Sequence, residues 1–271
     1  MNEFAAANAY DAFAAIYARY WGGAVVDTFL PAYDRLVLDR VPPSAAILDL
    51  CCGTGELAAV LLRRGARGRD VEGLVDAALA AGAAGFELEA ALYDRISPAE
   101  HGAGLMFVVA VPMQEPPSRA RRDMVFLDGV QDPGNAGTVL RSAAAAGIVD
   151  VLAGPATAAL WAPKTMRAGQ GAQFRLRLHQ PVSPEQLPQL LDGDWIGADA
   201  RDGEPLWQAS LPAGPVGWIF GAEGAGLSAQ ARAVCTRRVS IPIDSAVESL
   251  NVAAAAAVCL FERRRRAFTS R

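Results

Sequence analysis

The chain has 271 residues, of which 52% are hydrophobic and 20% charged, and its net charge is −4. This length and composition allow the burial of one large core or two ordinary ones. The alanine runs are too short and too interrupted to span a bilayer, and the first residues lack the basic and apolar regions of a secretory signal. We therefore expect a cytoplasmic protein without a membrane segment.

The cysteines and histidines exclude several kinds of site. Cys51, Cys52, Cys235 and Cys259 show neither CxxC spacing nor the density of a disulfide framework, so we expect reduced, structural thiols. The two histidines lie in separate segments. They offer little material for a histidine-rich metal site or a Ser-His-Asp triad, and we expect no metal.

Charge is distributed unevenly along the chain. Residues 1–115 hold 8 Arg and 15 Asp+Glu, which gives −7, whereas residues 116–271 hold 17 Lys+Arg and 14 Asp+Glu, which gives +3; the two sum to −4. Nearly all cations of the second part are arginines, whose guanidinium groups suit phosphate. The second part is therefore the better candidate for RNA contact, although the run Arg263–Arg266 alone is typical of a solvated helix end.

Apolar spacing predicts several elements in the first part of the chain. They are two helices over 4–40, a strand over 45–52, a glycine turn, an alanine and leucine helix over 56–65, a helix over 70–84, a strand running into a helix over 86–92, and a buried strand over 104–112.

A polar, proline-rich segment over 114–122 then marks a boundary, which we place between residues 115 and 116. Beyond it, short apolar runs alternate with helical segments as far as a long alanine-rich helix entered at residues 249–251. This alternation favours an α/β fold with a parallel sheet and helices on both faces.

The first segment that could carry chemistry is QDPGNAGTVLR, over 131–141. Gly134 and Gly137 bracket Asn135 at the mouth of a predicted helix, and Arg141 follows six residues later. An amide and a guanidinium beside the free N–H groups of a helix start could hold an anion or a hydroxyl group. Taken alone, the segment is more simply a turn in which Asn135 caps the helix and Arg141 lies on the surface.

Two later segments also follow predicted strands. In the loop after VGWIFG, glycines 221, 224 and 226 surround Glu223, a pattern typical of backbone that approaches a ligand or takes a positive φ. A plain tight turn explains it equally well. In RRVSIPIDSAVESLNVAAAAA, a polar loop enters the last helix at Ser249, Leu250 and Asn251, where capping by Ser249 accounts for part of the pattern.

In this order, the three segments resemble the motifs of the SpoU (TrmH-type) branch of the SPOUT methyltransferases, over residues 120–262. The resemblance implies a deep trefoil knot, S-adenosylmethionine bound within it, and a homodimer. It also implies an RNA methyltransferase acting on a ribose 2′-hydroxyl in rRNA or tRNA, of which we favour rRNA.

The resemblance assigns roles by motif position. Asn135, Arg141, Ser249 and Asn251 match the residues beside the reacting centre. Because the pKa of a guanidinium exceeds ~12, we interpret Arg141 as an electrostatic stabiliser of the developing alkoxide and leave the proton acceptor open. The positions that match cofactor-binding residues are Gly221, Glu223, Gly224, Gly226, Ile241 and Leu250.

The N-terminal text resembles a different family. ILDLCCGTGE, with Asp49, Gly53 and Gly55, is similar to the first strand and glycine loop of class I (Rossmann-like) methyltransferases. The several βα units of such a domain do not follow, because from about residue 70 the chain resembles half of the ribosomal-protein-like RNA-binding domain that precedes many SpoU domains.

We therefore divide the chain into a class I-like fragment over 1–68, a partial RNA-substrate-binding domain over 69–115 and a SPOUT domain over 116–271. One hypothesis is that the strand Ala45–Cys52 replaces a lost strand of the RNA-binding domain and pairs with the strand around Phe107–Val111. Two other functions stay open: a class I enzyme that methylates a small molecule through residues 45–60, and a catalytically impaired RNA-binding protein.

Overall fold

The computed structural model divides the chain between residues 112 and 113 into two compact units. The residues that it describes are 45–49, 57–63, 69–80, 82–97, 104–111 and 114–269. The two helices predicted over 4–40 lie outside these residues. No helix in the described part of the chain is both long and apolar enough to cross a membrane.

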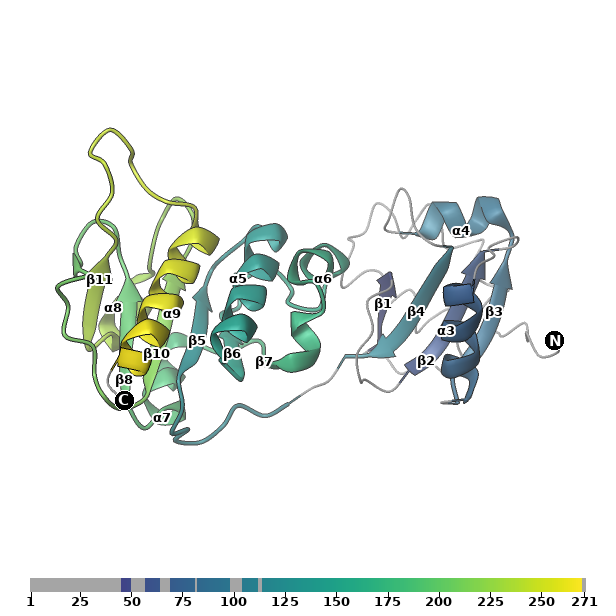
Figure 1. Ribbon diagram of the computed structural model, residues 1–271, viewed down its shortest axis with the longest axis horizontal. Helices are drawn as coiled ribbons and strands as arrows, with labels where there is room; N and C mark the ends of the chain where they lie inside the picture. Colours follow the sequence, from purple (N-terminus) through teal and green to yellow (C-terminus); the bar gives the residue numbers. More distant parts are fainter. Residues whose placement is uncertain are drawn as a thin grey trace. The chain divides into compact units, whose positions relative to one another are not determined.

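Unit 1 contains a four-stranded sheet in the order β1-β4-β2-β3 (Figure 1). β2 and β3 are parallel, and β4 runs antiparallel to both β1 and β2. The elements are β1 (Ala45–Asp49), β2 (Leu57–Arg63), α3 (Arg69–Ala80), β3 (Ala84–Leu88), α4 (Ala90–Ile96) and β4 (Leu105–Ala110). The predictions over 70–112 are thus confirmed as a helix, a strand, a helix and a strand.

The helix predicted over 56–65 is wrong, because β2 occupies that segment. Leu61 is 3% exposed and pairs with Phe86 on one side and Met106 on the other, so β2 lies inside the sheet. A short apolar run without a polar face fits a buried strand as well as a helix, and periodicity does not separate the two. A class I glycine loop leads from a strand into a helix, so this segment departs from that motif. Gly53 and Gly55 lie outside the described residues.

The pairing expected of the strand that begins at Ala45 is confirmed. β1 runs antiparallel to β4, with Ala45 opposite Ala110 and Asp49 opposite Met106. The two strands described before residue 69 therefore join one sheet with β3 and β4. The origin of residues 1–68 as a class I fragment stays a prediction.

Unit 2 is built on a seven-stranded sheet in the order β7-β6-β5-β10-β8-β11-β9, in which every described pairing is parallel. The strands are β5 (Met124–Asp128), β6 (Asp150–Ala153), β7 (Arg177–His179), β8 (Asp194–Ala198), β9 (Glu204–Pro205), β10 (Val216–Gly221) and β11 (Arg237–Ser240). The α-helices are α5 (Pro133–Ala146), α6 (Pro163–Gly169), α7 (Leu187–Leu190), α8 (Ala229–Val234) and α9 (Val252–Thr269), and the 3-10 helices are η1 (Ala172–Arg175) and η2 (Pro184–Gln186).

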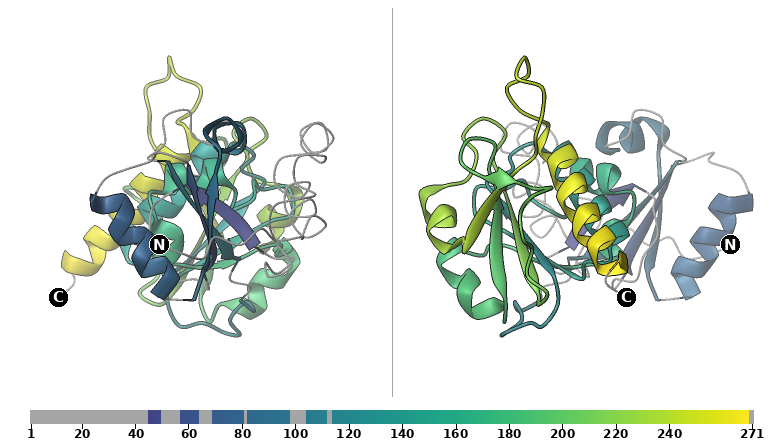
Figure 2. Two further views of the ribbon diagram at one scale, coloured as in Figure 1. Left: turned by 90° about the vertical axis from the view of Figure 1, so that its right-hand side faces the viewer. Right: turned by 60° about the vertical axis from the view of Figure 1, so that its left-hand side comes forward.

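Helices cover both faces of this sheet, with α5 and α9 on one face and α7 and α8 on the other (Figure 2). The predicted α/β fold with a parallel sheet is therefore confirmed. The trefoil knot that the family resemblance implies stays a prediction.

The central strands of unit 2 alternate their side chains between the two helical layers. Ile219 packs into the cluster on the α7 and α8 side, where the indole nitrogen of Trp195 donates to the carbonyl of Leu187 at 2.9 Å. Each large side chain buried in this way contributes about 1.5–3 kcal/mol. The rigid strands β5 and β10 end at Asp128 and Gly221, and the loops of the candidate site start there.

Candidate active site

A pocket lies at the carboxyl ends of β8, β10 and β11, beside the loop that leads into α9. Ligands of open parallel sheets bind at this edge. The pocket has a cavity volume of about 120 Å³. Its walls include Asp199, Phe220, Gly221, Ala222, Glu223, Gly226, Ile241, Ser249, Leu250 and Ala255.

One hydrogen-bonded network joins the three sequence segments through Glu223, which lines this pocket. The Asn135 side-chain nitrogen donates to Oε1 of Glu223 at 2.8 Å, and the Asn251 side-chain nitrogen donates to Oδ1 of Asn135 at 2.9 Å. We call these three residues the Asn-Glu-Asn network. The structure thus brings together one predicted residue from each segment, from the starts of two helices and the end of one strand.

The start of α5 presents Asn135 to this network. The carboxylate of Asp132 caps the helix by accepting from the backbone N–H of Asn135 at 2.8 Å, so the interpretation of Asn135 as the cap is wrong. This hydrogen bond, together with the nearby Lys164 ammonium, lowers the pKa of Asp132. With its backbone fixed by the cap, Asn135 keeps its side chain for Glu223 and Asn251.

The glycine loop after β10 forms a tight turn closed by two backbone hydrogen bonds between Ala222 and Gly226, of 3.0 and 2.8 Å. A Cβ on Gly221 would lie 2.3 Å from the carbonyl carbon of Gly226, so no side chain fits there. Gly226 has a φ of +71°, which favours glycine. Gly224 faces open space and does not line the pocket.

The sequence did not reveal how the glycine loop is held. Asp128, at the end of β5, accepts from the backbone N–H of Ser228 at 2.6 Å and from its hydroxyl at 3.1 Å. Ser228 in turn caps α8 by accepting from the N–H of Ala231. The end of the glycine loop is therefore attached to the neighbouring strand β5.

The other wall of the pocket is apolar and partly open to solvent. Ile241, Ile243 and Leu250 line it, and the cofactor-binding role expected of Ile241 and Leu250 stays a prediction. Leu250 is 38% and Ile243 37% exposed, which is high for such side chains. Ser249 also lines the pocket but does not cap α9, because Asn251 accepts from the N–H of Ala253 at 2.9 Å; that interpretation of Ser249 is wrong.

Arg141 lies apart from the Asn-Glu-Asn network. It is exposed in the second half of α5, and its side chain makes no hydrogen bond or ion pair with the described residues. Six residues of helix separate it from Asn135 by about 9 Å along the axis. The guanidinium is thus available to a bound molecule rather than committed to the fold.

A buried ion pair at the pocket was missed in the sequence. Asp199, 6% exposed, lines the pocket and pairs with Arg232, while Arg238 lies 4.0 Å away from the same carboxylate oxygen. Its place at the end of the apolar segment WIGADA (residues 195–200) was the available signal, because the carboxyl end of a parallel strand borders the ligand edge. No group of three potential metal ligands occurs among the residues that the structure describes.

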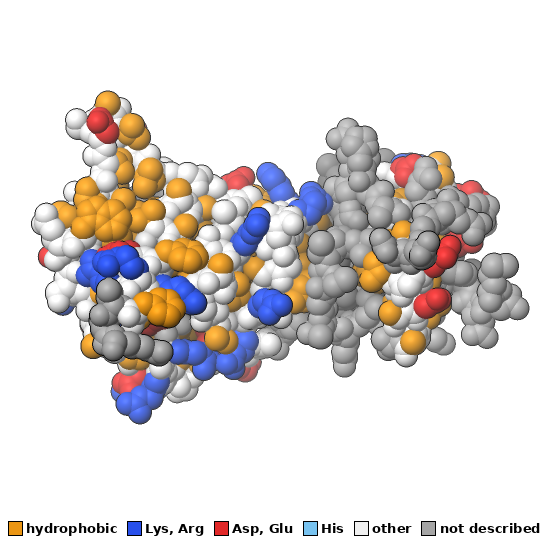
Figure 3. Space-filling model, viewed as in Figure 1, with side chains coloured by type: hydrophobic (Ala, Val, Ile, Leu, Met, Phe, Trp, Pro, Cys, Tyr) orange, Lys and Arg blue, Asp and Glu red, His pale blue; other side chains and the backbone are white. Residues whose placement is uncertain are grey.

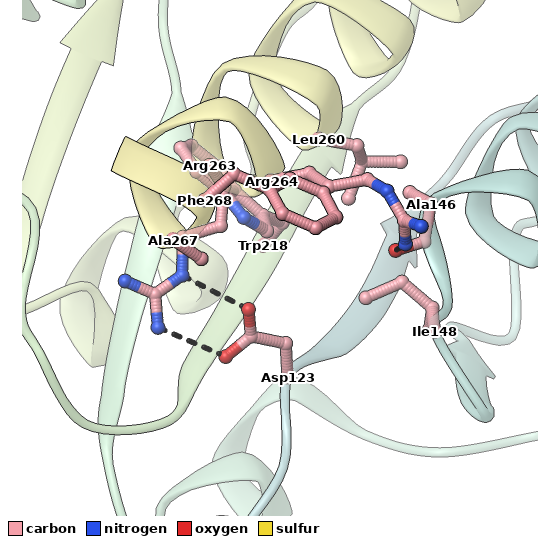
Figure 4. A pocket seen from close by; sticks show the side chains of 9 residues that line it. All are labelled: Asp123, Ala146, Ile148, Trp218, Leu260, Arg263, Arg264, Ala267 and Phe268. Carbon is pink, nitrogen blue, oxygen red and sulfur yellow. Dashed lines mark hydrogen bonds and ion pairs between the residues drawn. The ribbon is translucent and has the colours of Figure 1, made fainter. Parts of the chain in front are cut away.

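A second pocket lies along the C-terminal half of α9, away from the network (Figure 4). There Arg263 pairs with Asp123 at 2.9 Å, and the Arg264 guanidinium lies over the Phe268 ring at 5.3 Å from its centroid. Arg263 also donates to two backbone carbonyls. These contacts attach α9 to the start of β5, so part of the arginine run is structural.

A seven-stranded parallel sheet with a glycine-loop pocket at its carboxyl edge defines an α/β protein with a ligand site at the ends of its strands. The profile of the SpoU rRNA Methylase family matches residues 123–261, and the chain belongs to this family.

Curated relatives with assigned activities match the same region. The 23S rRNA (guanosine(2553)-2'-O)-methyltransferase RlmP of Bacillus subtilis is 35% identical over 158 residues, which cover 56% of this chain and 62% of the relative. The 23S rRNA (guanosine-2'-O-)-methyltransferase RlmB of Shewanella oneidensis is 36% identical over 149 residues, covering 53% of this chain and 60% of the relative. The match thus spans less than two thirds of each relative.

Solved structures share the fold over more of the chain. A structure assigned to the TrmH family of RNA methyltransferases, from Porphyromonas gingivalis, has a TM-score of 0.69 and 28% identity, and covers 97% of this chain and 100% of its own. The SpoU methyltransferase AviRb of Streptomyces viridochromogenes, solved with AdoMet, has a TM-score of 0.67 over 79% of this chain and 84% of its own, at 24% identity. At this identity, the similarity to AviRb shows a shared fold.

Proposed function

We propose that this protein transfers a methyl group from S-adenosylmethionine to a ribose 2′-hydroxyl of rRNA, in the cytoplasm. The Asn-Glu-Asn network carries the proposal, because it joins three distant segments through Glu223, which lines the pocket. Relatives that are 2′-O-methyltransferases of 23S rRNA support the choice of reaction and of substrate.

The residues of the pocket fit S-adenosylmethionine. The apolar side chains of Ile241, Ile243 and Leu250 suit the faces of an adenine ring, and their partial exposure leaves room for it. The absence of a side chain at Gly221 lets the loop backbone approach a ligand closely. When bound, this cofactor supplies an electrophilic methyl group on a sulfonium.

Methyl transfer from a sulfonium requires in-line placement of the oxygen nucleophile and little covalent help. Asn135 and Asn251 hold each other beside Glu223, which lines the pocket, and restrict where a ribose can enter. Arg141 stabilises the negative charge that develops on the ribose oxygen, since it stays protonated and has no partner among the described residues. The acceptor of the 2′-hydroxyl proton is not assigned to a residue.

The direct test is transfer of tritium from labelled S-adenosylmethionine to an unmodified 23S rRNA transcript. We expect label in RNA, and after nuclease digestion a mass increase on one ribose rather than on a base. A label on bases alone, or no label although calorimetry detects cofactor binding, would overturn the proposal.

We also propose that the protein acts as a homodimer through α9. The exposed side of this helix carries apolar side chains: Phe261 is 45% and Phe268 64% exposed, and Ala254 is exposed on the same side. Exposed aromatic side chains of this kind are typical of interfaces. Light scattering should give twice the chain mass, and Phe261→Glu should give the monomer mass; a monomeric wild-type protein would contradict the proposal.

A further inference from the structure

Residues 133–184 of unit 2 carry several exposed cations and no exposed carboxylate, with the exposed Asp132 at the border of this range. From residue 133 to residue 184 the sequence has a single acidic residue, Asp150, whose side chain is 1% exposed. Soluble surfaces normally intersperse both signs of charge. The five cations of the same range, Arg141, Lys164, Arg167, Arg175 and Arg177, are exposed, and Arg177 alone pairs with Asp150 among them. A surface of one sign is favourable for a ligand of the opposite sign.

Most of these cations make no close polar contact within the described part of the fold. The side chains of Arg167 and Arg175, like that of Arg141, make no hydrogen bond or ion pair with residues that the structure describes. Lys164 is 64% exposed, and its ion pair with Asp132 is long, at 3.6 Å. Free guanidinium and ammonium groups bind phosphate well.

Close packing fixes these cations relative to the candidate active site. α6 lies directly on α5, because a Cβ on Gly137 would come within 2.3 Å of the carbonyl oxygen of Thr165. The Lys164 and Asp132 pair joins the starts of the two helices, next to Asn135. Figure 3 shows Lys and Arg side chains gathering over α5 and α6. Lys164 thus lies near the Asn-Glu-Asn network, Arg167 lies further along α6, and Arg175 lies on η1.

We propose that Lys164, Arg167 and Arg175 form a cationic strip that binds consecutive phosphates of the RNA substrate. The strip would hold the strand that flanks the target ribose and so position that ribose beside Asn135. This inference rests on the proposed function for the identity of the ligand as RNA. It adds a substrate-binding surface on α6 and η1, outside the residues that contact the reacting centre.

The test measures how RNA binding by the full chain depends on salt. Anisotropy of a fluorescein-labelled RNA hairpin gives the negative slope of log Kobs against log[salt] over about 50 to 200 mM, and each lost phosphate contact reduces the magnitude of this slope by about 0.7–0.9. We expect the triple variant Lys164→Gln/Arg167→Gln/Arg175→Gln to reduce the magnitude of the slope by about 2 to 3. The affinity for S-adenosylmethionine should not change.

A matched control is Arg119→Gln/Arg121→Gln, because these exposed arginines are paired with Asp192. The control should leave the slope as in the wild type. In the tritium assay the triple variant should raise KM for RNA and leave kcat within about twofold. A slope unchanged in the triple variant, or lowered equally in the control, overturns the strip.

The two proposals fail in distinguishable ways. If the wild type transfers no methyl group but the triple variant still loses salt dependence, the strip stands and the enzymatic proposal fails. If methyl transfer proceeds and the triple variant keeps the wild-type slope, the enzyme stands and the strip fails.

Discussion

Asn135 and Glu223 lie 88 residues apart in sequence and share a 2.8 Å hydrogen bond between amide and carboxylate. An ionised carboxylate only accepts, whereas an amide both donates and accepts. The nitrogen of Asn135 therefore points to Glu223, and its oxygen is left to accept from Asn251. Asparagine at position 135 suits this double role, which a carboxylate there could not fulfil.

This relationship predicts the effect of Asn135→Asp. The change replaces the donor with a second carboxylate next to Glu223, and juxtaposed like charges are costly. We expect the affinity for S-adenosylmethionine to fall about tenfold, equivalent to about 1.4 kcal/mol, in isothermal titration calorimetry. The double variant Asn135→Asp/Glu223→Gln restores a donor and should recover most of that loss.

Thr138→Ala is the control for this experiment. Thr138 is exposed on the same helix, and its hydroxyl bonds only to the carbonyl of Gly134 at 2.8 Å. Its replacement should leave cofactor affinity unchanged. Wild-type affinity in Asn135→Asp would show that the contact with Glu223 does not shape the pocket.

Two glycines of the same loop should respond differently to alanine. Gly221→Ala places a Cβ 2.3 Å from the backbone of Gly226, where neither strand nor turn can yield easily, so we expect a loss of about 1–3 kcal/mol in unfolding free energy. Gly224→Ala adds a Cβ in open space and should be nearly neutral. Thermal unfolding with and without S-adenosylmethionine checks both, and equal melting temperatures would contradict the packing described.

Some of this structure could be predicted because the necessary signals are local. The parallel sheet of unit 2 follows from apolar runs alternating with helical segments, and the pocket residues Gly221, Glu223, Ile241 and Leu250 follow from motif positions. β2 could not be distinguished from a helix, since its Leu, Ala and Val residues are apolar on both faces and only its neighbours β3 and β4 decide the outcome.

The helix cap of α9 and the contacts between distant residues could not be predicted from the sequence. Ser249 and Asn251 are both good capping residues, and the choice of Asn251 depends on where α9 starts. Asp199 lines the pocket and forms an ion pair with Arg232, a residue of α8 that is distant from it in sequence. Such pairs depend on tertiary packing rather than on spacing along the chain.

Arg141→Ala should separate chemistry from cofactor binding. The guanidinium has no partner among the described residues, so its removal should not destabilise the fold. If it stabilises charge on the ribose oxygen, kcat should fall by about 10²–10³, the effect of losing one such donor. Single-turnover tritium transfer measures this, with calorimetry as the check that S-adenosylmethionine still binds. Full activity in the variant would remove Arg141 from the mechanism.

The buried Asp150 should make stability depend on pH. Arg122 donates to its carboxylate at 2.6 Å and His179 Nε2 lies 3.1 Å away, while the other ring nitrogen of His179 lies 3.1 Å from the Gln114 carbonyl. Burial alone would raise the pKa of Asp150, but the hydrogen bonds from His179 and Arg122 outweigh it and the pKa is lowered.

A carboxyl group whose pKa is lower in the folded state stabilises the fold above its unfolded value of 3.8 and loses this effect as the pH falls through the folded pKa. Asp150→Asn should therefore lower the free energy of unfolding by about 2 kcal/mol at pH 7. This loss is smaller than for a fully buried ion pair, because the side chain of Arg122 is 40% exposed. Urea unfolding followed by tryptophan fluorescence should show the difference from wild type shrinking below pH 3.8. Asp192→Asn, which breaks exposed pairs, should cost less than about 1 kcal/mol. If Asp150→Asn lowers the free energy of unfolding as much below pH 3.8 as at pH 7, packing and not charge explains the role of Asp150.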